Sequence, residues 1–156
     1  TMKNGTVKVV SAGVKSSNFH DQANRSANVI TVSSSGANAG YINFWREPIF
    51  ASDCITIQAG STVETILALQ FLKMIQKHIY RKASGSAQPH VYPSDLSSLK
   101  YLLPPKKLVD LFEGKVIAVN ELIGRQNQEN DQLEKLRDWL LPMLMNGQVT
   151  VSEARS

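Results

Sequence analysis

The side chains best suited to chemistry in this sequence are Cys54 and the histidines His20, His78 and His90. A thiol beside a histidine and an acid suggests nucleophilic catalysis, and Asp53 directly precedes Cys54. Cys54, however, begins a short apolar alternating run, so a buried structural thiol is the favoured interpretation. The histidines and the cysteine also lack the spacing of a zinc site. The sequence therefore predicts neither a nucleophile nor a metal centre.

Other catalytic motifs are equally sparse. The paired carboxylates of the acid-poor first part are Glu47 and Asp53, six residues apart, and structural roles are favoured for both. The glycine-bearing stretch 36–40 is too short for a dinucleotide-binding loop and predicts a turn between strands. No Walker lysine pattern occurs. We expect no enzyme activity and no bound cofactor in this chain.

The elements that must position these residues change type along the chain. Alternating apolar and polar residues predict strands at 6–10, 28–33, 41–44 and 54–57, separated by polar turns. Ser61 and Glu64 form a capping box, which predicts a helix from there through about residue 77. A short helical turn is expected at 93–98, and a strand at 99–103 that ends before two prolines.

A long helix is predicted after those prolines. Residues 106–141 contain no proline and predict a rod of roughly 50 Å that ends at Pro142, with a possible edge strand at 148–151. Steps of three and four residues trace a seam that is apolar at both ends and polar in the middle: Phe112, Val116, Val119, Ile123, Gln126, Asn130, Leu133, Arg137 and Leu140. The polar centre favours a specified register or antiparallel pairing with another helix. The alternative is a helix that folds back over its own domain.

Charge divides at the same place. The 156 residues carry 17 Lys and Arg against 13 Asp and Glu, for a net charge of +4. Residues 1–104 hold ten bases and five acids, which gives +5, whereas residues 105–141 hold six bases and seven acids, which gives −1. Basic side chains attract polyanions, because neutralised phosphates release their counterions. A basic first part and a near-neutral helix therefore suggest a polyanion partner, although an ordinary solvated surface remains the alternative.

Composition bounds the cellular setting. The chain is 42% hydrophobic and 19% charged, as in soluble globular proteins. No run approaches the roughly 20 apolar residues of a membrane span, and the first residues lack a signal core. A single cysteine fits a reducing compartment. A cytoplasmic protein with no membrane partner is expected.

Several stretches resemble one family in the right order. The segments ITVSSSGANAGYI (30–42) and EPIFASD (47–53) look like the core of a target recognition domain from the DNA specificity subunits of type I restriction-modification systems. GSAQPH (85–90), Asp95-Leu96 and LLPP (102–105) are similar to that family's next landmarks. LEKLRDWLLPMLMNG (133–147) resembles its conserved helical spacer and exit. The order of these four stretches along the chain carries the resemblance.

The resemblance implies an α+β fold with a target recognition domain at 1–104 and a helical spacer with its exit segment at 105–156. The domain would be small, mixed or antiparallel and β-rich, with one packed helix, and the spacer would form a coiled coil. It implies a non-catalytic subunit that reads half of a bipartite target in double-stranded DNA. The implied partners are a DNA adenine methyltransferase subunit, which binds S-adenosylmethionine, a restriction subunit acting as translocase and nuclease, and a second copy joined through antiparallel helices.

Given that job, the polar turns are the expected DNA-binding elements. Arginine pairs with guanine edges and Asn or Gln with adenine edges, whereas serines more often hold phosphates. The candidates are Lys15, Ser16, Asn18, His20, Asn24, Arg25, Ser34, Ser35, Asn38, Arg46, Ser86, Gln88 and His90. Ser34, Ser35 and Ser86 are expected to position the DNA rather than read it. The DNA target sequence is not encoded in any pattern of this kind.

The chain departs from the family pattern in carrying one recognition domain and one spacer where family subunits usually carry two of each. It also begins near what resembles the second strand, so it is expected to be either a natural half-length subunit or an excised half. A rival reading is a coiled-coil adaptor or protein-interaction module that does not bind DNA. A nuclease or self-contained methyltransferase is disfavoured by the missing acidic clusters and cofactor loops.

Overall fold

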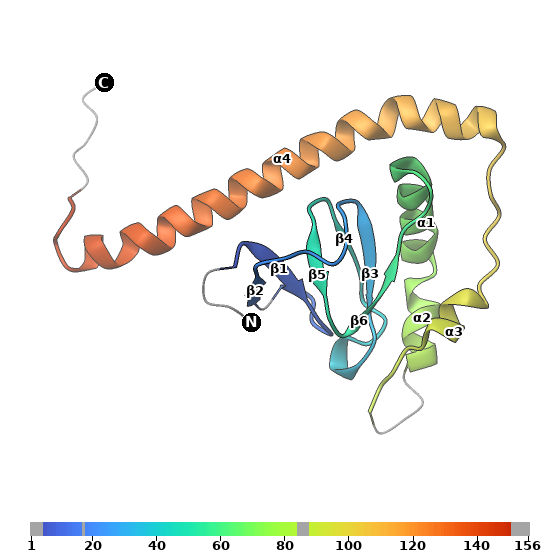
Figure 1. Ribbon diagram of the computed structural model, residues 1–156, viewed down its shortest axis with the longest axis horizontal. Helices are drawn as coiled ribbons and strands as arrows, with labels where there is room; N and C mark the ends of the chain where they lie inside the picture. Colours follow the sequence, from blue (N-terminus) through green and yellow to red (C-terminus); the bar gives the residue numbers. More distant parts are fainter. Residues whose placement is uncertain (1–4, 17, 84–87, 151–156) are drawn as a thin grey trace. The chain divides into compact units, whose positions relative to one another are not determined.

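Six short strands and four helices make up the computed structural model, which describes residues 5–16, 18–83 and 88–150 (Figure 1). The strands are β1 (Val7–Val10), β2 (Asn18–His20), β3 (Val29–Ser33), β4 (Ile42–Trp45), β5 (Ile49–Ala51) and β6 (Cys54–Ile57), with a 3₁₀ turn η1 (Gly36–Asn38). The helices are α1 (Thr62–Met74), α2 (Gln76–Ala83), α3 (Pro93–Ser97) and α4 (Lys106–Met145). The predicted α+β class is confirmed, as are the four predicted strands and the turn at 36–40.

The strands form two three-stranded sheets. In the first, ordered β2-β1-β5, β1 runs antiparallel to β2 and parallel to β5. The second, ordered β4-β3-β6, is antiparallel throughout. Its register pairs Val29 with Trp45 at one end of β3, and Ser33 with Cys54 at the other. The turn before β6 is therefore held beside the residues that follow β3.

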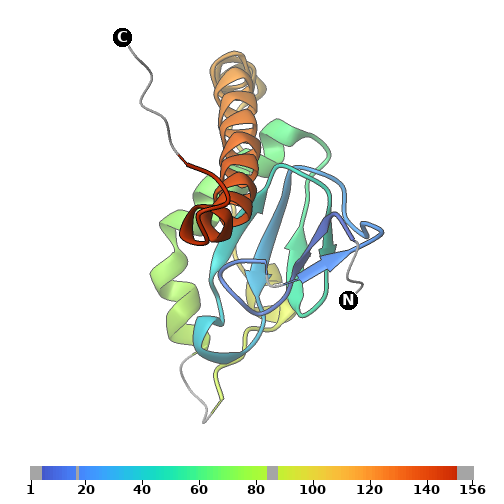
Figure 2. The same ribbon diagram turned by 90° about the vertical axis from the view of Figure 1, so that its left-hand side faces the viewer.

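All five residues of β3 are buried, so this strand is covered on both faces. Helices α1 and α2 lie along one side of the β4-β3-β6 sheet (Figure 2), where α1 contributes buried Val63, Ile66, Leu69 and Leu72. A second apolar cluster joins the two sheets through Val10, Val29 and Ile49. Strand β3 is thus the centre of the domain, and the turns at its two ends are fixed by the core.

The helix expected from residue 61 begins as predicted but extends further. The Ser61 hydroxyl accepts the Glu64 N–H at 3.2 Å, which caps α1. The helix is interrupted at Ile75 and resumes as α2, so two helices stand where one was expected. Gly40 explains the close approach of α2 to the turn after β3: its φ is +87°, and a Cβ there would lie 3.0 Å from Ile79 Cγ2.

Four expectations about regular structure were wrong or incomplete. The strand expected at 99–103 is irregular chain, since the two following prolines favour extended backbone without offering a partner strand. Pro142 lies inside α4 rather than ending it, because its missing N–H removes one hydrogen bond close to the C-terminus. Residues 148–150 form no strand, and Val151 lies outside the described residues. Strands β2 and β5, each three residues long, were missed.

Helix α4 ends in a Schellman motif. Gln148 N–H donates to Met143 O at 2.9 Å and Gly147 N–H donates to Leu144 O at 3.2 Å, with Gly147 at φ +68°. At 1.5 Å per residue, the 40 residues of α4 span about 60 Å. The chain divides into two compact units, Thr1–Gly114 and Lys115–Ser156, so the first turns of α4 belong to the first unit.

Candidate nucleic-acid interface

Ser34 and Ser35, which follow β3, both hydrogen-bond to the carboxylate of Asp53. Ser34 Oγ donates to Asp53 Oδ1 at 2.5 Å, and Ser35 Oγ donates to Asp53 Oδ2 at 2.7 Å. These two hydrogen bonds lower the pKa of Asp53, and the nearby His90 lowers it further. Because the folded-state pKa is depressed, the stabilisation is present above the unfolded value and is lost only as pH falls through the lowered pKa. Asp53 is ionised at neutral pH.

The segment 89–91 pairs with the same turn. Val91 N–H donates to Ser34 O at 2.8 Å, Gly36 N–H donates to Pro89 O at 3.1 Å, and Ser35 and His90 form an isolated antiparallel bridge. The His90 ring stacks on Tyr92 with 6.0 Å between centroids. Chain segments more than 50 residues apart in sequence are therefore joined by main-chain bonds.

We call this region the β3-end surface, defined by Ser34, Ser35, Asn38, Gln88 and His90. Asn38 and Gln88 are exposed on it. The turn 11–16 adjoins it, since Ser33 Oγ donates to Ala12 O at 2.7 Å. That turn carries two further candidates, exposed Lys15 and half-buried Ser16. The structure thus gathers five of the thirteen predicted DNA-binding residues at one end of β3, and two more lie on the turn that contacts Ser33 through Ala12.

Asn24 and Arg25 lie elsewhere, along β5 and β6. The Asn24 side chain uses both edges of its amide on the Ala51 backbone, donating from Nδ2 to Ala51 O at 2.8 Å and accepting Ala51 N–H at Oδ1 at 2.7 Å. Its amide edge is the group that would read adenine, so this bidentate contact gives Asn24 a structural role.

The Arg25 side chain is fixed by hydrogen bonds but stays exposed to solvent. Its Nε donates to Thr56 Oγ1 at 2.9 Å and its Nη1 to Asn24 O at 2.8 Å, while its backbone pairs with Ile49. The residue is exposed. A guanidinium carries five N–H donors, so the outer edge formed by Nη1 and Nη2 keeps donors in a fixed orientation.

Three other candidates occupy different settings. Arg46 follows Trp45, at the opposite end of β3 from Ser33, and its guanidinium lies 4.9 Å from the Phe44 ring centroid. Burial lowers the pKa of Arg46, which marks a packed side chain. His20 on β2 stacks on Phe50 at 4.2 Å between centroids, and Asn18 at the start of β2 is exposed. Ser86 lies outside the described residues.

Cys54 packs against the core. The thiol is half-buried against the Val10, Val29 and Ile49 cluster, and its Sγ lies 3.7 Å from Val10 O. Desolvation by burial raises the pKa of Cys54, which disfavours the thiolate. Across 5–16, 18–83 and 88–150, no group of three or more His, Cys, Asp or Glu side chains is placed to hold a metal ion. In the same ranges, no helix is long and apolar enough to cross a membrane.

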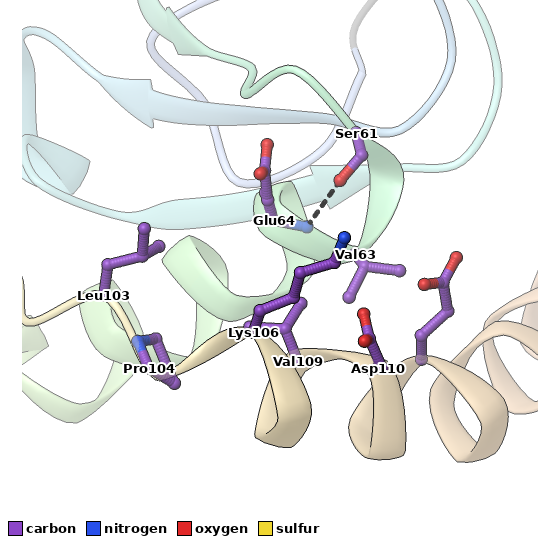
Figure 3. Close-up of a pocket in the computed structure, with 9 residues that line it drawn as sticks. Ser61, Val63, Glu64, Leu103, Pro104, Lys106, Val109 and Asp110 are labelled. Carbon is purple, nitrogen blue, oxygen red and sulfur yellow. Dashed lines mark hydrogen bonds between the residues drawn. The ribbon is translucent and has the colours of Figure 1, made fainter.

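A pocket of about 380 Å³ lies between the start of α1 and the first turns of α4. Figure 3 shows Lys106 and Asp110 pointing from α4 toward Ser61 and Val63. Glu64 and Glu113 add two more carboxylates to its lining, so acids outnumber the single lysine. Phosphates are repelled by such a lining, and none of the predicted DNA-binding residues lines it.

The chain is similar to proteins of one family. Residues 1–132 match the family described as type I restriction modification DNA specificity domain. The chain belongs to this family. The match extends through the first compact unit, Thr1–Gly114, which we call the β-rich unit, and on into α4. The first two-thirds of α4 is therefore part of the family pattern.

Two relatives are specificity subunits of type I restriction enzymes. The specificity domain is 31% identical over 67 residues to the type I restriction enzyme HindI specificity subunit of Haemophilus influenzae, covering 43% of this chain and 15% of that protein. It is 29% identical over 82 residues to the MjaIX specificity subunit of Methanocaldococcus jannaschii, covering 53% and 19%. The aligned part therefore spans about a fifth or less of these relatives. Both relatives are named as specificity subunits.

A solved structure has the same fold. The S subunit of the type I restriction-modification system from M. genitalium matches with a TM-score of 0.66 and 23% identity, over 92% of this chain and 39% of that one. The specificity domain thus has the fold of part of a larger S subunit.

All nine predicted seam residues lie on α4. Val119 and Leu133 are 52% and 55% exposed, and Gln126, Asn130 and Arg137 are also exposed. The seam falls on both sides of the unit boundary, with Phe112 before it and the other eight residues after it.

Sequence reasoning gave Asp53 a structural role but missed that it joins the two serines. The polar turn 33–40 signalled Ser34 and Ser35, but nothing in the local pattern identified a carboxylate 18 residues away as their partner. Thr56, which holds Arg25, was missed for the same reason, since it reads as an ordinary strand residue. The available signal for Asp53 was its place in the short turn directly before the strand that begins at Cys54.

Proposed function

We propose that this specificity domain is the non-catalytic DNA-recognition part of a type I restriction-modification system and reads one half of a bipartite target. The observation that carries the proposal is the family match over residues 1–132, which covers the β-rich unit and the first two-thirds of α4. Charge supports it, because the five excess positive charges of residues 1–104 suit a phosphate backbone and the near-neutral helix suits a protein partner.

The β3-end surface and Arg25 are the proposed contacts with DNA. Asn38, Gln88 and His90 carry donors and acceptors that match base edges, and Lys15 supplies a charge for phosphate. Arg25 presents a fixed fork, which suits bidentate pairing with guanine. Asn24 and Arg46 serve the fold in this proposal, through the Ala51 backbone and the Phe44 ring.

Helix α4 is proposed to pair antiparallel with the same helix of a second copy. Its exposed apolar residues Val119 and Leu133 flank the polar centre at Gln126 and Asn130, an arrangement that fixes register at some cost in stability. In this proposal the spacer sets the distance between two half-targets. The partners would be an adenine methyltransferase subunit that binds S-adenosylmethionine and a restriction subunit, both of which supply the chemistry that this chain lacks.

Sequencing of methylated DNA tests the proposal directly. Cells would express this chain with its methyltransferase subunit, and the modified adenines would be mapped. Two identical copies should give a split motif with palindromic halves, because each copy reads the same half-sequence. Cells that express the methyltransferase subunit alone are the control. Methylation without any bipartite motif would contradict the proposal.

Removal of the Arg25 side chain should relax the reading of one base. We expect Arg25→Ala to reduce discrimination at a single position by about 1–3 kcal/mol, or roughly 5–150-fold, because a bidentate pair with guanine is lost. Arg25→Lys should show nearly the same loss, since a lysine keeps the charge but not the fork. Binding to DNA substituted at each position in turn measures the effect.

Arg81→Ala on α2 is the matched control for Arg25, because it removes the same side chain and charge from an exposed helix position. It should weaken binding slightly and equally for all sequences. Uniform weakening by Arg25→Ala, with full retention in Arg25→Lys, would instead assign Arg25 to a phosphate.

A further inference from the structure

Asp53 is an exposed acid within a part of the molecule where phosphate attraction is expected. Both of its carboxylate oxygens accept serine hydroxyls, and Ser34 Oγ also lies 3.1 Å from the Asp53 carbonyl oxygen. The β3–β6 register explains why it stands there, because Ser33 pairs with Cys54 and so brings the preceding residue beside Ser34. The contact is thus built into the sheet.

The hydroxyl protons decide what the serines can do. A serine hydroxyl has one proton, and in Ser34 and Ser35 that proton is directed at Asp53. While the carboxylate is ionised, it competes with a DNA phosphate for both hydroxyl protons. A carboxylate at this position also repels phosphate, so Asp53 does not gain DNA affinity by direct contact. The two serine hydroxyls and the Asp53 carboxylate therefore act by binding one another.

What they hold is the main chain of the β3-end surface. The Ser34 carbonyl accepts Val91 N–H, and Gly36 two residues later donates to Pro89 O. The orientation of residues 34–36 therefore sets where the segment 89–91 lies, and with it the His90 ring. The same turn leads into η1, which carries exposed Asn38.

We propose that Asp53 is a positioning residue for sequence reading, which acts through Ser34 and Ser35 to fix Asn38 and His90 in the geometry that base contacts require. The inference rests on the proposed function and deepens it. Charge-assisted hydrogen bonds are stronger than neutral ones, so an ionised carboxylate with two hydroxyl donors is suited to hold a surface turn. Selectivity for the target then depends on a residue that touches no base.

Two matched variants test the role. Asp53→Asn keeps the shape but replaces one acceptor oxygen by an NH₂ group, and the double variant Ser34→Ala, Ser35→Ala removes the donors and keeps the acid. Both should raise the hydrogen-exchange rates of the Gly36 and Val91 amides about tenfold or more, since two charge-assisted bonds are lost. Both should also lower the ratio of target to off-target methylation by at least tenfold. The double serine variant changes no charge, so it should leave the salt dependence of DNA binding unchanged. Asp110→Asn on α4 removes the same charge and should change neither readout.

The two readouts separate the possible failures. Unchanged hydrogen-exchange rates of the Gly36 and Val91 amides in both variants would overturn the proposal. Faster exchange of these amides with an unchanged ratio of target to off-target methylation would overturn it as well. If Asp53→Asn alone lost selectivity, direct base contact by Asp53 would replace the positioning role. If the wild-type chain and its methyltransferase subunit together methylate no motif, the proposed function and the positioning role are both overturned. The hydrogen-exchange rates would still show whether Asp53 holds residues 34–36 against the segment 89–91. Where Asp53→Asn does not fold, the double serine variant decides.

Discussion

Replacement of Ile49 by alanine is expected to lower the free energy of unfolding by about 2–5 kcal/mol, a large part of the stability of a domain this size. Ile49 is 0% exposed and packs with Val10 and Val29 between the two sheets. Its β5 strand has three residues, so few other contacts can compensate. Its backbone also pairs with Arg25, whose N–H donates to Ile49 O at 3.1 Å. The loss should therefore reach the proposed DNA contact.

Urea or guanidinium unfolding of the wild type and variants measures this effect. Ile49→Val is the conservative companion and should cost about 0.5–1.5 kcal/mol, because one methyl group is lost. Leu102→Ala is the exposed control: Leu102 is 89% exposed in the irregular chain before Pro104, so its removal should cost little. Equal effects of Ile49→Ala and Leu102→Ala would show that the cluster between the sheets does not carry the stability of the domain.

The central strands were predictable because their signal is local. Residues 29–33 and 42–45 contain alternating or continuous β-branched and aromatic residues next to polar turns, and burial follows from that pattern. Strands β2 and β5 were missed because three residues are too few for a period to register. Strand β5 is also preceded by Pro48, and its parallel pairing with β1 joins residues about 40 positions apart. Nothing near Ile49 in the sequence encodes that partner.

The surface was predictable as a set of turns and not as a geometry. The polar, glycine-bearing stretch predicted a turn around Ser34 and Asn38, and the structure has a turn there. Two facts depended on non-local partners: the Asn24 amide is occupied by Ala51, 27 residues away, and the Ser34 proton is committed to Asp53. Side chains of the same type thus differ in what remains available to a ligand. Composition alone does not record this difference.

The prolines also show that local sequence signals do not decide where an element ends. The sequence predicts that the helix ends at Pro142, yet α4 continues to Met145, and the left-handed residue Gly147 follows it. A proline interrupts a helix by removing one donor and crowding the preceding turn, and the cost is smallest where few turns remain. Residues 99–103 are mostly apolar and precede Pro104, but they form no strand, because a strand also needs a neighbouring strand to pair with. Local propensity sets what is allowed, and tertiary pairing selects from it.

DNA binding by this chain should weaken steeply with salt. If the five excess positive charges of residues 1–104 each neutralise a phosphate, log K should fall against log[salt] with a slope of about −4.5. Between 50 and 200 mM salt that slope lowers the association constant about 500-fold. Fluorescence anisotropy with a labelled duplex over this range measures the slope. This effect is larger than that expected from any single base contact.

Two lysine variants locate the charge that produces the slope. Lys15→Gln removes an exposed base beside the β3-end surface and should make the slope shallower by about one unit. Lys107→Gln removes an exposed base from the first turn of α4, outside that surface, and should leave the slope unchanged. A slope near zero for the wild type would favour the adaptor alternative, in which α4 binds protein and the β-rich unit does not bind DNA. Equal effects of the two variants would instead indicate diffuse attraction and no defined interface at the end of β3.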